Sequence, residues 1–204
     1  MPHSAQVLPW THALLAVARA ADRLKLVSAH DALLLLRNCL SASKLLYTLR
    51  SARCAGHELL QSFDDLQRSA LGRICNVTLT DDQWLQASLP VRMGGLGVRR
   101  VSSLATSAFL ASAAGTRQLQ DQILIGTGVT SDVAFDQSLA SRIQSAPQGA
   151  AVGKQKAWDT PVIMAEFGEL MKRYLEPRHK ARLLAAAAPH SGDWLHAIPI
   201  AACG

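Results

Sequence analysis

The chain has 204 residues, of which 49% are hydrophobic and 18% charged, so it is long and apolar enough to bury a core and most of it is not disordered. Aromatic residues make up only 5%, the apolar residues are mainly leucine and alanine, and long alternations of Val, Ile, Thr and Tyr are missing, which argues against a large sheet. We therefore predict an all-α protein, and its net charge of +6 raises the question of an anionic partner.

The positive charge is concentrated in the first half of the chain. Residues 1–102 carry twelve Lys and Arg against seven Asp and Glu, whereas residues 103–204 carry nine against eight. A basic half fits a polyanionic partner, and nucleic acid is the commonest one. A solvated basic surface explains the same composition, so both interpretations stay open.

Helical periodicity dominates the first 52 residues. Apolar residues recur at helical spacing over residues 10–27, and Ser28 begins a Ser-x-x-Asp helix start. Residues 31–52 continue as one broken helix or two. The apolar face of this segment consists of Leu33, Leu36, Leu40, Leu45, Leu46 and Leu49, and the basic residues beside that face are Arg37, Lys44, Arg50 and Arg53.

Three further helices are predicted before residue 116. Thr80 to Gln83 form a capping box for a short helix that Pro90 ends. A helix rich in small residues begins at residue 101 and is expected to end at Gly115. The longest of the three covers residues 57–76, and its apolar stripe consists of Leu59, Phe63, Leu66, Ala70 and Ile74.

The rest of the chain is less regular. Loops surround a short helix at 133–145, and a further helix begins with Asp159 or Thr160 as its N-cap and Pro161 in its first turn. We therefore expect three parts, namely a helical domain at 1–125, a linker with a short helix at 126–157, and a C-terminal helical segment at 158–204.

The motifs that carry catalysis or bind metals in other proteins are incomplete in this chain. Asp64 and Asp65 are adjacent carboxylates, but they lie in the middle of a predicted helix, so we interpret them as a solvated helix face rather than a magnesium site. The stretch Gly149 to Gln155 has three residues between its glycines and no Ser or Thr after the lysine, unlike a phosphate-binding loop. The sequence therefore predicts no catalytic residue, no metal site and no cofactor.

The cysteines and the N-terminal segment indicate the cellular compartment of the protein. Cys39, Cys54, Cys75 and Cys203 are far apart and match no zinc spacing, which indicates isolated thiols in a reducing environment. No basic stretch precedes the apolar N-terminal segment as in a signal peptide, and no apolar run approaches the roughly 20 residues that span a bilayer. We expect an intracellular protein, nuclear or cytoplasmic, without a membrane partner.

The stretch LPVRMGGLGVRR, residues 89–100, combines the most flexible residues with dense positive charge. Its glycines permit positive φ and close backbone approach, and exposed amides in such a turn bind phosphate. The residues alone favour the simpler explanation, a tight reversal between two helices with its arginines solvated. The residues concerned are Arg92, Gly94, Gly95, Gly97, Arg99 and Arg100.

The order of these segments resembles the region that follows the catalytic palm in reverse transcriptases of non-LTR retrotransposons. In that family a leucine- and arginine-rich helical thumb is followed by a segment that contains a tryptophan, here Trp84. A Pro-x-x-x-Gly-Gly-Leu-Gly element follows, here from Pro90 to Gly97. The resemblance covers residues 30–115 well and residues 155–204 more weakly.

The resemblance implies a multi-helix, thumb-like bundle with a Gly-rich turn, followed by a looser helical C-terminal region. The metal-binding aspartates of this RNA-directed DNA polymerase family lie in the palm, which this chain lacks, so the chain is expected to be inactive alone. Its implied partners are the phosphate backbone of an RNA or DNA duplex and the missing palm domain. The implied nucleic-acid-binding residues are Arg37, Lys44, Arg50, Arg53, Arg92, Gly94, Gly95, Gly97, Arg99 and Arg100.

A second function class remains open, namely a helical interaction or scaffold protein with no nucleic-acid role. It is supported by the high content of leucine and alanine and by the nearly neutral second half. The two classes differ in what they predict for the basic residues. If these residues share one surface, binding is favoured. If they are scattered or paired with acids, the scaffold is favoured.

Overall fold

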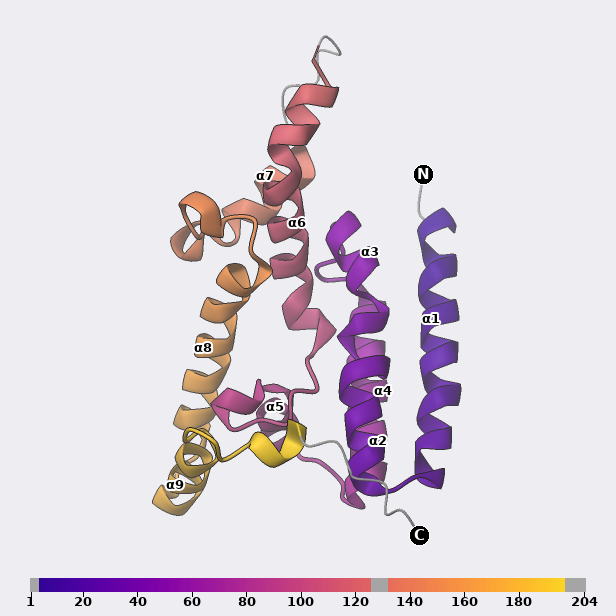
Figure 1. Cartoon of the computed structure of the whole chain (residues 1–204), viewed down its shortest axis with the longest axis vertical. Coiled ribbons are helices and arrows are strands. Elements are labelled where there is room, and N and C mark those ends of the chain that lie inside the picture. Colours follow the sequence, from indigo (N-terminus) through magenta and orange to yellow (C-terminus); the bar gives the residue numbers. More distant parts are fainter. Residues whose placement is uncertain (1–3, 126–131, 197–204) are drawn as a thin grey trace.

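The computed structural model describes residues 4–125 and 132–196, and every regular element within these ranges is helical (Figure 1). The prediction of an all-α protein is therefore confirmed. Within the same ranges, no helix combines the length and the apolarity needed to cross a membrane. Cys203 and the predicted loop residues 126–131 lie outside the described residues.

The first half of the chain forms a column of helices with one long helix beside it. In Figure 1, α1 stands at one side, next to the column formed by α2, α3 and α4. Ser28 is the N-cap of α2, where its Oγ accepts a hydrogen bond from the amide of Asp31 (3.2 Å), as its Ser-x-x-Asp pattern predicts. The elements are α1 (Ser4–Arg23), α2 (Ala29–Leu35), a π-helical turn η2 (Leu36–Leu40), a 3₁₀ turn η3 (Ala42–Lys44), α3 (Leu46–Ser51) and α4 (Glu58–Cys75).

The segment predicted as one broken helix or two is interrupted at Ser41. There the helical hydrogen bonding stops, and the carbonyl of Leu40 accepts instead from the side-chain amide of Gln67 on α4 (2.8 Å). Gln67 is fully buried, so this bond satisfies a backbone acceptor that the break would otherwise leave unpaired in the core. Of the predicted apolar face on either side of the break, Leu33, Leu36, Leu45 and Leu49 are buried, and Leu40 and Leu46 are partly buried against the same core.

The buried face of α4 is rotated slightly from the predicted stripe. Phe63 and Ala70 are buried as predicted, whereas Leu59, Leu66 and Ile74 are only partly buried. The remaining buried positions of the helix are Leu60, Asp64, Gln67 and Leu71. The difference arises because two polar residues, Asp64 and Gln67, face inward and hydrogen-bond other segments.

The capping box before α5 (Asp81–Ser88) forms as predicted. The side chain of Thr80 accepts from the amide of Gln83, and the side chain of Gln83 accepts from the amide of Thr80. Pro90 follows the end of this helix. A single 3₁₀ turn, η4 (Val91–Met93), then leads into the glycine-rich loop.

The helix α6 (Val101–Ile123) does not end at Gly115, so that prediction is wrong. A Cβ on Gly115 would lie 3.3 Å from the Cα of Gly153, which shows that the two backbones meet at this point. Glycine here permits close packing between segments, which offsets the roughly 1 kcal/mol that glycine costs inside a helix. The pattern within α6 cannot distinguish a glycine that ends a helix from one that another segment contacts.

The C-terminal part returns toward the first half of the chain. In Figure 1, α8 runs beside α6, and the last described turn crosses back toward α5 and α2. The helix α8 begins at Gln155, inside the range predicted as a linker, and Pro161 lies within it rather than in its first turn. The elements are α7 (Val133–Ala140), the 3₁₀ turns η5 (Ile143–Ser145) and η6 (Gly149–Ala151), α8 (Gln155–Arg173), α9 (Pro177–Ala186) and η7 (Asp193–His196).

Four apolar clusters hold the elements together and cross the predicted domain boundaries. One cluster joins α1, α3, α4 and α6, and a second joins α2, α4 and α5 to Leu195 of η7. A third packs Leu89 against Ile163 and Leu183 of α8 and α9, and a fourth packs Trp158 of α8 on α6 and α7. The helices of the 158–204 range are thus packed on the first half of the chain.

Asp64 is buried, so the interpretation of this residue as part of a solvated helix face is wrong. Its side chain caps the N-terminus of α6, because Oδ1 accepts from the amide of Val101 (2.7 Å) and Oδ2 accepts from the amide (3.1 Å) and the hydroxyl of Ser102. A carboxylate is favourable at this end of a helix dipole. Burial raises the pKa of Asp64, while the bonds from Ser102 and Val101 and the charge of Arg100 act in the opposite direction.

The substitution Asp64→Ala is expected to lower the free energy of unfolding by about 2 kcal/mol, because the first amides of α6 lose their acceptor inside the core. Urea unfolding followed by circular dichroism measures this difference. Asp65→Ala is the matched control, since Asp65 is exposed and accepts only from Gln61 one helical turn away. Equal effects of the two substitutions would show that the cap contributes nothing.

Candidate nucleic-acid interface

One open cleft collects part of the predicted binding set. Arg37, Arg92, Gly97 and Arg99 all line it, and its volume is about 600 Å³. Its walls come from four separate segments, namely the π-turn η2, the stretch from η4 to Arg99, the first turns of α8, and η7. We call this feature the basic cleft, since its lining holds Arg37, Arg92, Arg99 and Lys156.

The charge of the basic cleft is unbalanced. Four cationic side chains line it, and Asp159 is the single carboxylate among the lining residues, which leaves an excess of three positive charges. Lys156 was not among the predicted binding residues, because it lies in the range interpreted as a linker. The signal available in the sequence was the pair Lys154 and Lys156, placed immediately before an apolar helix.

Arg37 is partly buried, and its guanidinium has no carboxylate partner among the described residues. Its Nη2 donates to the carbonyl of Leu195 (2.9 Å), and its Nε lies 3.4 Å from Oδ1 of Asn38. Its Nη1 is buried and has no hydrogen-bond acceptor among the described residues. Burial also lowers the pKa of Arg37. An unsatisfied buried donor costs about 1–3 kcal/mol, so this placement of the Arg37 guanidinium has a cost for the folded protein.

Arg99 and Arg100 are engaged within the protein. Arg99 contacts both carboxylate oxygens of Asp159, at 2.9 and 2.8 Å, and Arg100 pairs with Glu166. These two salt bridges join the start of α6 to α8, and all four side chains are largely shielded from solvent. Arg92 differs, since it is exposed and has no ion pair among the described residues.

The backbone amides of the glycines do not form a phosphate-binding turn. The amide of Gly94 donates to the carbonyl of Val91, that of Gly95 to Pro90, and that of Gly97 to Leu89. Each of these amides therefore already has an acceptor. The predicted role of the three glycines as amide donors to phosphate is not supported by this geometry.

The glycines instead shape the wall of the cleft. A Cβ on Gly95 would lie 2.1 Å from the carbonyl oxygen of Leu89, so only glycine fits there. Gly97 has φ +76°, and a Cβ on it would lie 2.9 Å from Cδ of Arg37. Because Gly97 has no side chain, the aliphatic part of Arg37 packs beside it.

Arg50 lies on α3 and Arg53 follows it, and only Arg50 bonds to a residue that lines the cleft. Arg50 donates from Nε and Nη2 to Oε1 of Gln155 (3.2 and 2.8 Å), and Gln155 lines the basic cleft. Arg53 donates to the side chain of Gln137 on α7. Both arginines are exposed and bonded to neutral amides, so neither is paired with a carboxylate among the described residues.

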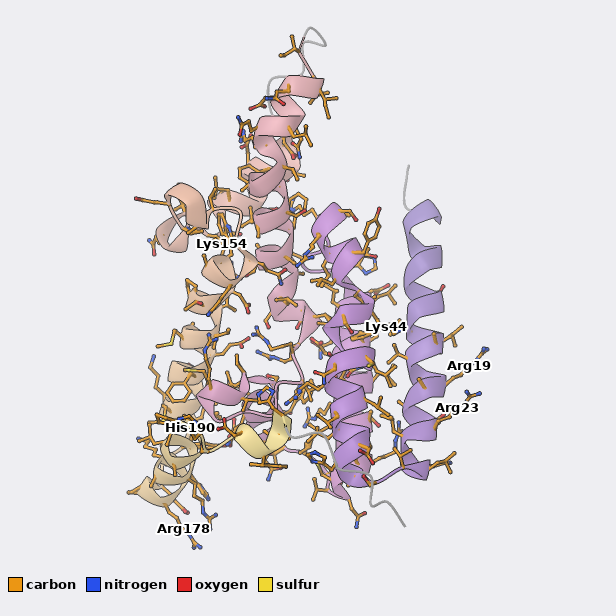
Figure 2. The ribbon with its side chains drawn as sticks, in the orientation of Figure 1. Arg19, Arg23, Lys44, Lys154, Arg178 and His190 are labelled. Carbon is orange, nitrogen blue, oxygen red and sulfur yellow. The ribbon has the colours of Figure 1, made fainter. Side chains whose placement is uncertain are left out.

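The other unpaired cations of the first half lie away from the cleft. Lys44 is exposed but does not line the cleft, and Figure 2 shows it and Lys154 on opposite sides of α6 in that view. Arg19 and Arg23 are exposed on α1, and Figure 2 shows both pointing away from the rest of the molecule. The basic residues of the first half therefore do not share one surface, since Arg19 and Arg23 lie on α1 and Lys44 on η3, whereas Arg37, Arg92 and Arg99 line the cleft.

The substitution Asp159→Ala is expected to lower the free energy of unfolding by about 3 kcal/mol, because it leaves the shielded guanidinium of Arg99 without its carboxylate. Chemical denaturation of the purified protein measures the change. The control is Glu169→Ala, which breaks an exposed pair with Arg173 and should change the free energy of unfolding far less. A cost for Asp159→Ala as small as that of the control would contradict a structural role for the buried pair.

The substitution Gly97→Ala is expected to destabilise the protein by about 1–2 kcal/mol, because alanine is strained at φ +76° and its Cβ meets Arg37. Gly168→Ala is the matched control, since Gly168 lies within α8 and a Cβ there meets no atom within 4 Å. That change should raise stability by up to about 1 kcal/mol. The two thermal midpoints should therefore shift in opposite directions, and a shift of the same sign would refute this reasoning.

Comparisons of this chain with models of protein families, with curated proteins and with solved structures found no match.

Proposed function

We propose that this protein binds the phosphate backbone of nucleic acid through the basic cleft, without reading its sequence. The observation that carries the proposal is the charge of the cleft, where Arg37, Arg92 and Lys156 have no carboxylate partner among the described residues. Arginine and lysine contacts to phosphate position a nucleic acid but carry no sequence information. Arg50 on α3 adds a further cation beside the cleft, because it bonds to Gln155 of the lining.

The proposal includes an ancestry. We propose that the chain is the thumb and connector of a non-LTR retrotransposon reverse transcriptase, with an RNA or DNA duplex as its ligand and a palm domain as its missing partner. The support is the order of the leucine- and arginine-rich helices, Trp84 and the Pro90 to Gly97 element, together with a basic cleft built around that element. Without the palm aspartates, such a chain binds nucleic acid but does not polymerise it.

A scaffold function is the second candidate, and a specific observation favours it. Two of the three arginines beside the glycines, Arg99 and Arg100, form salt bridges to α8. In that case the positive charge of this stretch serves to hold helices together rather than to meet a ligand. The two candidates differ in whether the remaining unpaired cations bind anything.

The experiment measures fluorescence anisotropy of a labelled RNA–DNA duplex with the purified protein across a salt series. The double variant Arg92→Ala/Lys156→Ala is expected to weaken binding and to reduce the slope of log affinity against log salt by about 2, since each phosphate contact contributes about 0.9. Both side chains are exposed, so their removal should leave the fold intact.

The matched control is Lys172→Ala/Arg178→Ala, which removes one lysine and one arginine outside the cleft (Figure 2 labels Arg178 on α9). Its slope should stay close to that of the unmodified protein. Equal losses in the two double variants would remove the cleft from the proposal. A folded protein that does not bind the duplex even at low salt would favour the scaffold function.

A further inference from the structure

The basic cleft has three positive charges that its internal salt bridge does not neutralise. Asp159 neutralises Arg99, which leaves Arg37, Arg92 and Lys156 facing the same space from three different segments. A backbone phosphodiester carries one negative charge and two terminal oxygens. A terminal phosphate monoester carries a charge of about −1.5 to −2 at neutral pH and three acceptor oxygens, which matches three converging cations better.

The shape of the cleft favours the same ligand. Its walls come from η2, η4, α8 and η7, and its volume of about 600 Å³ lies in the range of small-molecule sites. The cleft is open, but Arg37 is partly buried in its wall. A phosphate in the middle of a strand has a sugar on both sides, whereas a phosphate at an end has one free side and approaches a recessed guanidinium with less hindrance.

The hydrogen-bond donors and the apolar residues of the cleft indicate which organic group accompanies the phosphate. Nη2 of Arg37 is fixed on the carbonyl of Leu195, and its buried Nη1 has no acceptor among the described residues, so the arginine is positioned with one donor unused. Val91 and Ile163 add apolar surface to the lining. Apolar surface beside the cations suits an organic phosphate ester rather than inorganic phosphate.

We propose that the basic cleft is a binding site for a terminal phosphate monoester of nucleotide size. This inference rests on the proposed function insofar as both use the same cleft. The monoester has two sources, the 5′-phosphorylated end of a nucleic acid and a free nucleoside monophosphate. The experiment below distinguishes these two sources.

The test compares three 3′-labelled single-stranded oligonucleotides by fluorescence anisotropy at one salt concentration. One carries a 5′-phosphate, one carries a 5′-hydroxyl, and one carries a 5′-hydroxyl but is two nucleotides longer, which matches the charge of the first. We expect the 5′-phosphorylated form to bind about tenfold more tightly than both others. A calorimetric titration with adenosine 5′-monophosphate tests the free nucleotide in parallel.

Substitutions inside and outside the cleft test whether the cleft causes the preference for the 5′-phosphate. Arg92→Ala/Lys156→Ala should remove the preference for the 5′-phosphate, and Lys172→Ala/Arg178→Ala should keep it. Arg37→Lys retains the charge but loses the planar fork, so it should reduce the preference, and its thermal midpoint shows whether the variant is folded. The exposed pair Arg92 and Lys156 keeps the test valid if substitution of Arg37 disturbs the fold.

Each outcome decides between the two proposals. A 5′-phosphate preference that the cleft variant loses supports the monoester site, and saturable binding of the nucleotide alone supports it with a free nucleotide as the source. Equal binding of all three oligonucleotides without nucleotide binding overturns the monoester site but leaves backbone binding in place. No binding of any ligand overturns both, and nucleotide binding without oligonucleotide binding overturns only the nucleic-acid function.

Discussion

The buried carboxylate of Asp64 is the interaction on which much of the remaining structure depends. It accepts hydrogen bonds from the amides of Val101 and Ser102 and so fixes where α6 begins. Since α6 packs against α3, α4, α7 and α8, the position of its first turn sets the positions of its neighbours. The two arginines that precede this turn then necessarily face α8, where Asp159 and Glu166 receive them.

The basic cleft follows from the same geometry. Once the start of α6 is fixed, the loop before it closes by three hydrogen bonds from glycine amides to carbonyls of the segment 89–91, and it leaves room for Arg37 beside Gly97. The C-terminal turn η7 completes the arrangement, because Leu195 is buried against α2 and its carbonyl anchors Arg37. Segments nearly 160 residues apart in the chain therefore define one surface.

The net charge of the chain gives little information about which of its cations are free to meet a ligand. Of the arginines beside the glycines, Arg99 and Arg100 stabilise the packing of α6 on α8, and only Arg92 is exposed without an ion pair among the described residues. A shielded salt bridge and a phosphate contact use the same donors, so a residue held in the first is not free for the second. The proposed binding therefore depends on cations that lack a carboxylate partner and also line the cleft, and Lys156 joins Arg92 in that group.

The sequence by itself determined the helical class, the Ser28 cap and the Thr80–Gln83 capping box, because these features depend on residues within one helical turn of each other. Only the tertiary structure decided the roles of Asp64, Gly115 and Arg99. Asp64 bonds to a segment 37 residues later, and Arg99 pairs with a carboxylate 60 residues later. The spacing of residues within one helix shows whether a side chain lies on an apolar stripe. Its burial and its ion pairs depend on which distant segment packs against it. The periodicity of a single helix does not identify that segment.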